Sequence, residues 1–378
     1  MARPTTLVYP SAEDLGVDVF DPGVFGRGMP WDDFARLREL APVCWHEEPE
    51  VQGWSAGSGF WAVTGWEDIR HIGRATEAFS SWAGGTQLRD PEPKDLSFWR
   101  EMLLNMDPPE HTRLRRIVAT AFTSKVLAHR ERMIRSQASQ LVDAVVSRGR
   151  CDFAEEIGAE LPLRTITDVM GLAQSDRHLL AKWTDRVIGY QDDELVAREH
   201  GDEQPKVNPR SREALVDMLE YARAVAVEKR AHPGDDLLSI LVNAEVDGER
   251  LSDEEFETFF FLFTVAGNDT THSALPGGLL ALIRFPDELD RLIADPHLLP
   301  GAVEEMLRFA PPVIHFRRTA TRDVELDGQL IRSGDKVAVF YPAGNRDPGV
   351  FASPDRFDVG RSPNPHLAFG TGAHVCIG

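Results

Sequence analysis

The pattern of apolar and polar residues predicts a mainly helical protein with small β-sheets. From His111 to about Ala294, most apolar residues recur at helical spacing, as they do in the segment 130–146. Short apolar runs at 42–45, 60–64 and 336–341 are typical of strands. Residues 324–326 and 329–331 flank Asp327-Gly328, a favoured turn pair, and therefore predict a hairpin.

The most apolar part of the chain predicts one long central helix. Ser252 and Glu255 form a capping-box pattern at its start, and Phe256, Phe259 and Phe260 then follow on a buried stripe. Proline has no N–H, so Pro276 should end or kink this helix. Before it, the polar segment 191–212 is interrupted by Gly and Pro. We expect a long surface loop there, of the kind that often acts as a lid.

Composition excludes several classes of protein. The net charge of -20 disfavours a nucleic-acid partner, which would need a basic surface. The longest apolar stretch, 259–265, is far shorter than the roughly 20 residues of a membrane span. Three cysteines, an odd and sparse set, favour a reducing compartment such as the cytoplasm. No linker-like segment divides the chain, so we predict a single domain, residues 1–378.

The last ten residues place a cysteine after two glycines. Gly370 and Gly372 allow a tight turn that can aim backbone N–H groups at the sulfur of Cys376. We favour a thiolate that binds a haem iron, with Phe369 shielding one side. Two alternatives remain open. One is a glycine-rich turn around an ordinary buried cysteine. The other is a zinc site formed by His366, His374 and Cys376, although no fourth ligand is evident.

A polar segment interrupts the middle of the predicted central helix, at 266–271. Gly267 costs about 1 kcal/mol relative to alanine there. A threonine hydroxyl can bond to the carbonyl four residues earlier and bend the helix. The resulting notch would hold Asp269 beside Thr270, and such an acid–alcohol pair can relay protons to dioxygen at an iron. Helix breakage near the surface, with a solvated Asp269, explains the same residues equally well.

Charged residues supply further candidates. Glu305 and Arg308 lie three residues apart in the predicted helix 300–309, and taken alone they are best explained as an exposed ion pair. Four basic residues could bind the propionates of haem, although each alone is more simply a surface charge. They are His111, Arg115, Arg318 and His374.

The segment 111–135 carries seven basic residues and one acidic residue, a local charge of +6. The basic residues are Arg113, Arg115, Arg116, Lys125, Arg130, Arg132 and Arg135. Such a surface would suit an acidic ferredoxin, because electrostatic steering speeds association.

Taken together, these motifs resemble the cytochrome P-450 superfamily. The matching segments occur in the family's order and at similar separations, and the resemblance covers the chain from about Trp61 onward. They are His111-Thr112-Arg113-Leu114-Arg115-Arg116, Gly267-Asn268-Asp269-Thr270-Thr271, Glu305-Met306-Leu307-Arg308, Pro354-Asp355-Arg356-Phe357 and Phe369 to Gly378.

The resemblance implies a role for each candidate residue. Cys376 is the expected axial ligand of a haem b iron, where a thiolate favours O–O cleavage. Asp269 and Thr270 are the expected proton-delivery pair. The remaining expectations are a buried triad of Glu305, Arg308 and Arg356, the four propionate partners already named, and haem-lining positions at Ala266, Gly267, Phe369, Gly370 and Gly378.

The resemblance also implies an activity. A monooxygenase of this family inserts one atom of O2 into an apolar substrate, with electrons from a ferredoxin-type partner and its reductase. Within the superfamily, the chain resembles the actinobacterial group that acts on cholesterol side chains and methyl-branched lipids. A non-catalytic haem-thiolate sensor, or an inactive truncated chain, is the alternative.

Two further expectations concern the substrate. The family's pocket walls fall on uncharged residues, namely Leu103, Leu104, Val265, Ala266, Val313 and Ile314. The acidic segment 192–203 should form the pocket rim and disfavour anions. We therefore expect a neutral steroid, terpenoid or branched lipid.

The family continues past the cysteine with a helix and a hairpin, whereas this sequence stops at Gly378. We therefore expect a fragment that lacks both elements. Such a fragment should hold haem poorly, because part of the shell that covers the haem is missing.

Overall fold

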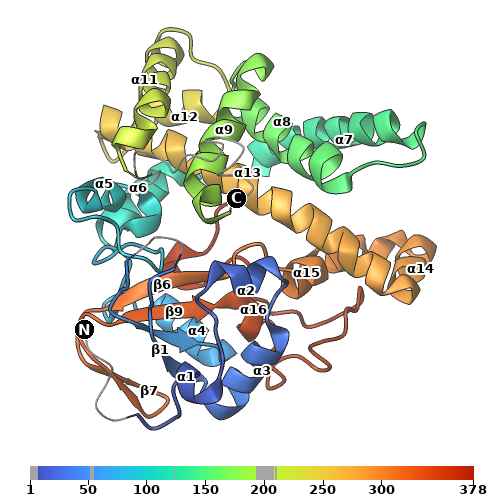
Figure 1. The fold of residues 1–378 in the computed structure, drawn as a ribbon. Coiled ribbons are helices and arrows are strands. Elements are labelled where there is room, and N and C mark those ends of the chain that lie inside the picture. Colours follow the sequence, from blue (N-terminus) through green and yellow to red (C-terminus); the bar gives the residue numbers. More distant parts are fainter. Residues whose placement is uncertain (1–6, 52–54, 123, 193–207, 209–210) are drawn as a thin grey trace. The chain divides into compact units, whose positions relative to one another are not determined.

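The computed structural model describes residues 7–51, 55–122, 124–192, 208 and 211–378 (Figure 1). The chain divides into two units, which are considered separately here. Unit 1 consists of Met1–Pro91 and Gly277–Cys376, and unit 2 of Glu92–Pro276 and Ile377–Gly378.

Unit 1 is built on a five-stranded sheet with the order β1-β2-β9-β6-β3. The strands are β1 (Val43–His46), β2 (Phe60–Val63), β3 (Phe79–Ser80), β6 (His315–Ala320) and β9 (Lys336–Phe340). Only β2 and β9 pair in parallel, with Phe60 opposite Lys336. Every residue of β2 and β9 is buried, as expected for central strands that are covered on both faces. The strands predicted at 42–45, 60–64 and 336–341 are therefore confirmed.

A separate hairpin in unit 1 pairs β7 (Val324–Leu326) with β8 (Gln329–Ile331). Its turn residues Asp327 and Gly328 have φ values of 46° and 77°. Positive φ at both positions is what a two-residue hairpin turn requires, so the pattern predicted this turn correctly.

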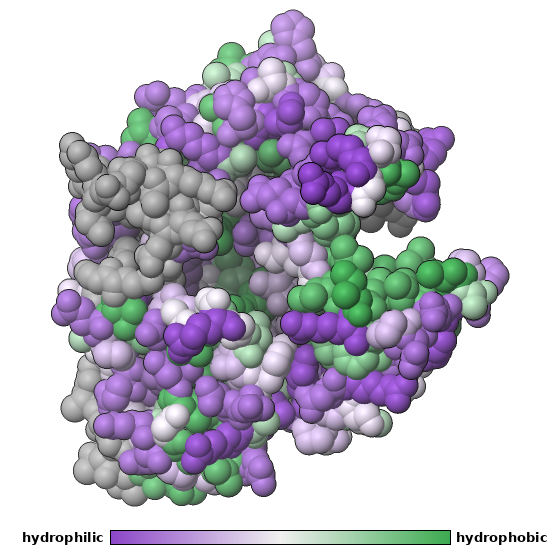
Figure 2. Space-filling model, turned by 45° about the vertical axis from the view of Figure 1, so that its right-hand side comes forward, coloured by the Kyte–Doolittle hydropathy of each residue, from purple (hydrophilic) through white to green (hydrophobic). Residues whose placement is uncertain are grey.

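Helices complete unit 1 and pack against the sheet and one another. They are α1 (Ala12–Leu15), α2 (Pro22–Gly26), α3 (Trp31–Leu40), α4 (Trp66–Arg74), α14 (Pro286–Ala294), α15 (Leu299–Phe309) and α16 (Tyr341–Gly344). Large apolar side chains are exposed on the last turns of α13 and on α14 and α15, where Figure 2 shows a concentration of hydrophobic surface. They are Leu280, Ile283, Ile293, Leu299 and Val303.

Unit 2 is almost entirely helical. Its helices are α5 (Leu96–Arg100), α6 (Glu110–Ala119), α7 (Ser124–Val146), α8 (Glu160–Val169), α9 (Arg177–Ile188), α11 (Val216–Ala231), α12 (Leu237–Asn243) and most of α13 (Asp253–Arg284). A π-helix (Ala154–Ala159) leads into α8, and β4 (Glu245–Val246) pairs with β5 (Glu249–Arg250). One apolar core joins these helices, with Phe256, Phe259 and Phe260 of α13 almost fully buried in it.

The long helix α13 begins as predicted and continues further than predicted. The Ser252 N–H donates to the Glu255 carboxylate (2.8 Å), and the Glu255 N–H donates to the Ser252 hydroxyl (3.1 Å), so the capping box is present. Pro276 was expected to end or kink the helix, but α13 runs on to Arg284. Burial of Ala281 and Leu282 in an apolar cluster of unit 1 stabilises the last turns and offsets the missing N–H.

Most of the predicted surface loop, 191–212, lies outside the residues that the structure describes. The same is true of the acidic segment 192–203 apart from Asp192, so the predicted lid and rim stay predictions.

Candidate active site

The loop that carries Cys376 is a tight turn built on two glycines of unit 1. Gly370 and Gly372 have φ values of 69° and 72°, which favour glycine. A Cβ atom on Gly372 would lie 1.8 Å from the carbonyl oxygen of Gly73 in α4, so only glycine allows this close approach. The Cys376 N–H donates to the Phe369 carbonyl (2.8 Å), and the Cys376 side chain is exposed. The tight turn is therefore present, and the ordinary buried cysteine is the wrong explanation for it.

Comparison with Cys44 shows why Cys376 is the better candidate for a metal ligand. Cys44 is fully buried, and burial raises the pKa of its thiol to about 12, so it stays protonated. Cys151 is exposed but lacks the two glycines that Cys376 has four and six residues before it. The zinc alternative is not supported, because no cluster of three or more His, Cys, Asp or Glu side chains occurs within the described residues. His366 is instead paired with Glu304, at 2.8 Å.

Two of the predicted propionate partners lie near this loop in unit 1. Arg318 on β6 is 4% exposed, and its guanidinium donates to the Arg317 carbonyl (2.8 Å). Burial raises the pKa of the Tyr341 phenol, and the charge of Arg318 partly offsets that rise. The Tyr341 hydroxyl in turn lies 3.6 Å from where a Cβ atom on Gly370 would be. His374, within the loop, lies 3.3 Å from the Ser81 hydroxyl.

In unit 2, the segment 266–271 remains helical, so helix breakage is the wrong explanation for its composition. The Thr270 hydroxyl donates to the Ala266 carbonyl (2.8 Å), which is the contact expected of a helix notch. A Cβ atom on Gly267 would lie 2.7 Å from the Ile166 side chain, so glycine lets α8 pack closely here. Ala266 is exposed although Val265 before it is buried, so a small side chain stands on the exposed side of the helix at this point.

Asp269 lies in the same segment, and its carboxyl has a raised pKa. Burial is the largest effect on this carboxyl and raises its pKa from the ordinary value of 3.8. A carboxyl of this kind holds its proton to higher pH than a solvated one, as a proton donor must. His111, 2% exposed, and the half-buried Arg115 lie on one face of α6, also in unit 2.

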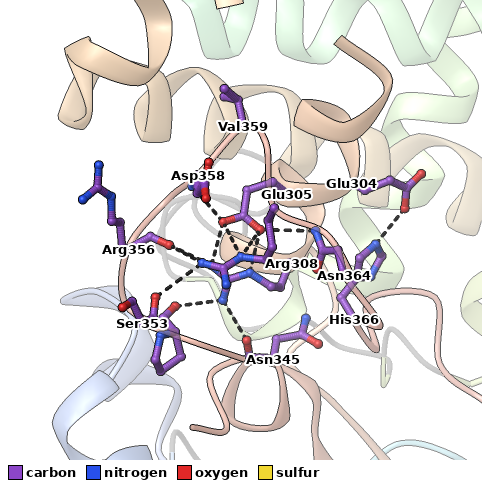
Figure 3. Close-up of polar contacts among 12 residues, drawn as sticks. Glu304, Glu305, Arg308, Asn345, Ser353, Arg356, Asp358, Val359, Asn364 and His366 are labelled. Carbon is purple, nitrogen blue, oxygen red and sulfur yellow. Dashed lines mark hydrogen bonds and ion pairs between the residues drawn. The ribbon is translucent and has the colours of Figure 1, made fainter. Parts of the chain in front are cut away.

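Glu305 and Arg308 form the most completely buried ion pair among the described residues. Both side chains are 0% exposed, and two hydrogen bonds join them, at 2.7 and 2.8 Å (Figure 3). Arg308 also donates to the carbonyls of Asn345, Pro354 and Arg356. The pair thus ties α15 to the loop that precedes the cysteine, and an exposed pair is the wrong explanation.

The predicted third member of this cluster is wrong. The Arg356 side chain is 66% exposed and points away from Glu305 (Figure 3). Its guanidinium lies 3.5 Å from the Glu288 carboxylate instead. Arg361, 8% exposed, donates instead to both Glu305 oxygens, at 3.0 and 3.1 Å. Asn364 adds another bond, at 3.2 Å. Arg356 contributes its carbonyl only, because the backbone turns there and directs the side chain outward.

The predicted basic surface on 111–135 is also largely cancelled. Arg113 pairs with Glu110, Glu249 and Glu255, and Arg116 pairs with Asp247. Arg135 pairs with Glu131 at 3.2 Å, and Arg130 is buried. The side chain of Lys125 lies outside the described set. The predicted charge of +6 counted one segment alone and left out Glu110 and the acids of the β4–β5 hairpin and of the start of α13. The ferredoxin surface itself stays a prediction.

The residues present fit a haem cofactor. Unit 1 supplies an exposed thiol in a glycine turn, together with the buried cation of Arg318. Unit 2 supplies His111 and Arg115 on α6 and the exposed Ala266 on α13. A thiolate and cationic donors are the groups that would hold an iron and two propionates. Of the expected haem-lining positions, Ala266 is exposed on α13 of unit 2, whereas Gly267 faces Ile166 of α8. Phe369 and Gly370 precede Cys376 in the loop of unit 1, and Gly378 follows it.

Comparisons with known proteins place the chain in a family. The family model described as Cytochrome P450 matches residues 205–378. The methyl-branched lipid omega-hydroxylase of Mycobacterium tuberculosis is 41% identical over 350 residues, which cover 91% of this chain and 79% of that protein. The chain is a cytochrome P450. The steroid C26-monooxygenase of the same organism is 36% identical over 383 residues, 100% of this chain and 85% of the relative.

A solved structure agrees with this assignment of a P450. A Mycobacterium marinum cytochrome P450 in complex with pseudoionone superposes with a TM-score of 0.85 at 38% identity, over 99% of this chain and 89% of that one. The mainly helical P450 fold and the monooxygenase class predicted from the sequence are thereby confirmed. Membership implies a haem-thiolate cofactor, O2 as co-substrate and a redox partner. Among the described residues, none of the helices combines the length and apolar character needed to cross a bilayer.

Proposed function

We propose that this P450 hydroxylates a neutral, apolar molecule of steroid, terpenoid or branched-lipid type. The names of its relatives support this, since one acts on methyl-branched lipids and another on steroids. The solved relative holds pseudoionone, which is neutral. The single observation that carries the proposal is the agreement of these relatives over nearly the whole chain.

The predicted pocket positions suit such a substrate. Leu103 and Val265 are buried in the apolar core of unit 2, and Leu104 is half-buried beside them in sequence. Val313 and Ile314 precede β6 in unit 1. None of these residues carries a charge. Apolar contact at about 25 cal/mol per Å2 would supply most of the affinity, and a few polar groups would fix orientation.

The residues of the chain then take distinct roles. Haem b, when bound through Cys376, supplies the activation of dioxygen. His111, Arg115, Arg318 and His374 would pair with its propionates. Asp269 would hold a proton at its carboxyl and supply it to the reaction site, while Thr270 would orient that transfer. Because these residues fall in both units, we propose that residues 1–378 act as a single domain.

We propose a ferredoxin-type protein and its reductase as the electron source. With the basic residues of α6 already paired, this proposal rests on the family's need for a redox partner. The sparse cysteines favour a reducing compartment, so we place this activity in the cytoplasm.

A matched panel of ligands tests the substrate class. Branched fatty alcohols and their methyl esters would be compared with the corresponding free acids, alongside neutral sterols and terpenoids. We expect the neutral compounds to shift the haem spectrum and the free acids to bind more weakly. If only small polar or anionic compounds shift the spectrum, the proposal is wrong.

Substitution of the cysteine tests the ligand assignment separately. In Cys376→Ser, the reduced, carbon-monoxide-bound protein should lose its thiolate-type spectrum. Cys151→Ser provides the matched control, because that cysteine is also exposed but lies in the other unit, and it should leave the spectrum unchanged. A thiolate-type spectrum that survives in Cys376→Ser would exclude the assignment.

A further inference from the structure

Asp269 has a titratable neighbour on its own helix. His272 follows it by three residues in α13, a spacing that places both side chains on one face of the helix. Both residues are half-buried, so each has access to solvent as well as to the protein. His272 is therefore a group that can exchange protons with water within reach of the acid.

A second acid near Asp269 is Asp185, which lies on α9. The Thr184 hydroxyl lies 3.3 Å from the Thr264 carbonyl of α13, and the Trp183 ring centroid lies 6.2 Å from that of Phe260. These contacts fix α9 against α13 one residue before Asp185. The exposed Asp185 carboxylate is thereby held close enough to influence Asp269.

The charges around Asp269 act in opposite directions. Burial raises its pKa most, His272 lowers that pKa, and Asp185 raises it. Arg186, which follows Asp185 on α9, donates to the Asp217 carboxylate (3.0 Å) and to the Ala214 carbonyl (2.6 Å). Within the described part of the chain, His272 and Asp185 are thus the charged groups that set this acid.

The backbone near His272 leaves an acceptor without its usual helical donor. In a regular helix, the carbonyl of His272 would accept from the N–H of residue 276, but that residue is Pro276. The Thr270 hydroxyl already donates its proton to Ala266. Thr270 is therefore not the proton source in this arrangement, and Asp269 must recover each proton that it gives up from another group.

We propose that His272 is a positioning residue that returns protons from solvent to Asp269. The imidazolium N–H bond breaks as the O–H bond of the Asp269 carboxyl forms, and the neutral imidazole then takes a proton from water. No electrons move in this step. Asp185 opposes the imidazolium and keeps the carboxyl protonated until it is used. The inference rests on the proposed proton-delivery role of Asp269.

Three variants test the inference by two independent measurements. His272→Gln cannot titrate, so the infrared titration midpoint of the Asp269 carboxyl should rise in the ferric, substrate-free protein, and product formed per electron should fall about tenfold. Asp185→Asn should move the same midpoint down. His272→Arg keeps a cation but cannot relay protons at these pH values, so its coupling should be low and independent of pH.

The controls separate this inference from the proposed function. Ser273→Ala, at the exposed next position, should match the unmodified protein in midpoint and coupling. If Asp269→Asn uncouples electron use from product while His272→Gln keeps the normal coupling and pH profile, the role of His272 is excluded and that of Asp269 stands. If Asp269→Asn itself leaves coupling unchanged, the proton-delivery role fails first, and this inference fails with it.

Discussion

Two carboxylates of this P450, the fully buried Glu305 and the half-buried Asp269, have opposite surroundings. Glu305, in unit 1, is 0% exposed and accepts bonds from Arg308, Arg361, Asn364 and the N–H of Asp358. Asp269, in unit 2, is held where burial is the dominant influence on its acidity. Hydrogen-bond donors surround the Glu305 carboxylate and stabilise its charge. At Asp269, burial favours the protonated carboxyl.

This difference distinguishes a charge that stabilises the fold, at Glu305, from an acid that can transfer protons, at Asp269. A buried charge is tolerated when hydrogen bonds replace the water that it lost, and it then fixes the chain segments that supply the donors. A buried acid without such donors makes the folded state less stable when it ionises, but it gains a useful acidity. We therefore expect Glu305 variants to lose the fold and Asp269 variants to lose the chemistry.

The largest expected effect is on Glu305. Glu305→Ala leaves Arg308 buried without its partner, which costs about 3–5 kcal/mol, so little folded haem protein should be recovered. Haem content and thermal unfolding measure this loss. Glu304→Ala is the matched control on the same helix, because the Glu304 side chain is 53% exposed and should tolerate the change. Equal haem content and stability in both variants would contradict the buried-cluster assignment.

Asp269→Asn, unlike Glu305→Ala, should leave the fold intact and lower the activity. Product formation should fall on the order of 100-fold while haem binding persists. Because the pKa of Asp269 is raised above 3.8, the native protein loses stability as pH rises from that value through the raised pKa. Asp269→Asn removes this loss, so at neutral pH its melting temperature should equal or exceed that of the unmodified protein. A lower melting temperature at neutral pH would show that the carboxylate is stabilising after all.

A smaller effect distinguishes two arginines close in sequence. Arg361→Ala removes two bonds to Glu305 and should cost about 2 kcal/mol. Arg356→Ala should cost less than about 1 kcal/mol, since only an exposed pair with Glu288 is lost and the Arg356 carbonyl remains. Chemical denaturation of both variants measures the difference. Equal losses of stability in the two variants would support the predicted triad of Arg356 with Glu305 and Arg308.

The smallest effect belongs to the paired surface of α6. Arg116 is 58% exposed and pairs with Asp247 at 2.7 Å. Arg116→Ala should change stability by less than about 0.5 kcal/mol, and the rate of reduction by a ferredoxin should change by less than about twofold. Stopped-flow reduction at several salt concentrations checks the second value. A steep fall with salt that the variant abolishes would show that this surface guides the partner.

Local patterns predicted the local structure well. The capping box at Ser252, the Asp327-Gly328 turn and the tight turn before Cys376 each depend on neighbouring residues, so the sequence contains the information needed. Glu305 and Arg308 share a helix face for the same reason. The contribution of such a pair to stability depends on its burial, however. Only the resemblance to P450s indicated that Glu305 and Arg308 are buried.

The errors all involve partners from distant segments. Arg356 and Arg361 lie on one loop, and nothing in their spacing shows which side chain turns inward. The acids that neutralise Arg113 come from 110, 249 and 255, two of them far along the chain. Pro276 was judged by its missing N–H alone, whereas burial of residues beyond it stabilises the helix.

The pairing of β2 with β9 also constrains the order in which parts of the protein can fold during synthesis. Phe60 pairs with Lys336, 276 residues later, so the central sheet of unit 1 stays incomplete until most of the chain has left the ribosome. At about 5–20 residues per second, β2 waits roughly 14–55 seconds for its neighbour. Unit 2, which is nearly continuous from Glu92 to Pro276, has no such delay. During synthesis, the edge of β2 that later pairs with β9 therefore needs protection from aggregation, which makes this stretch a natural client for a chaperone.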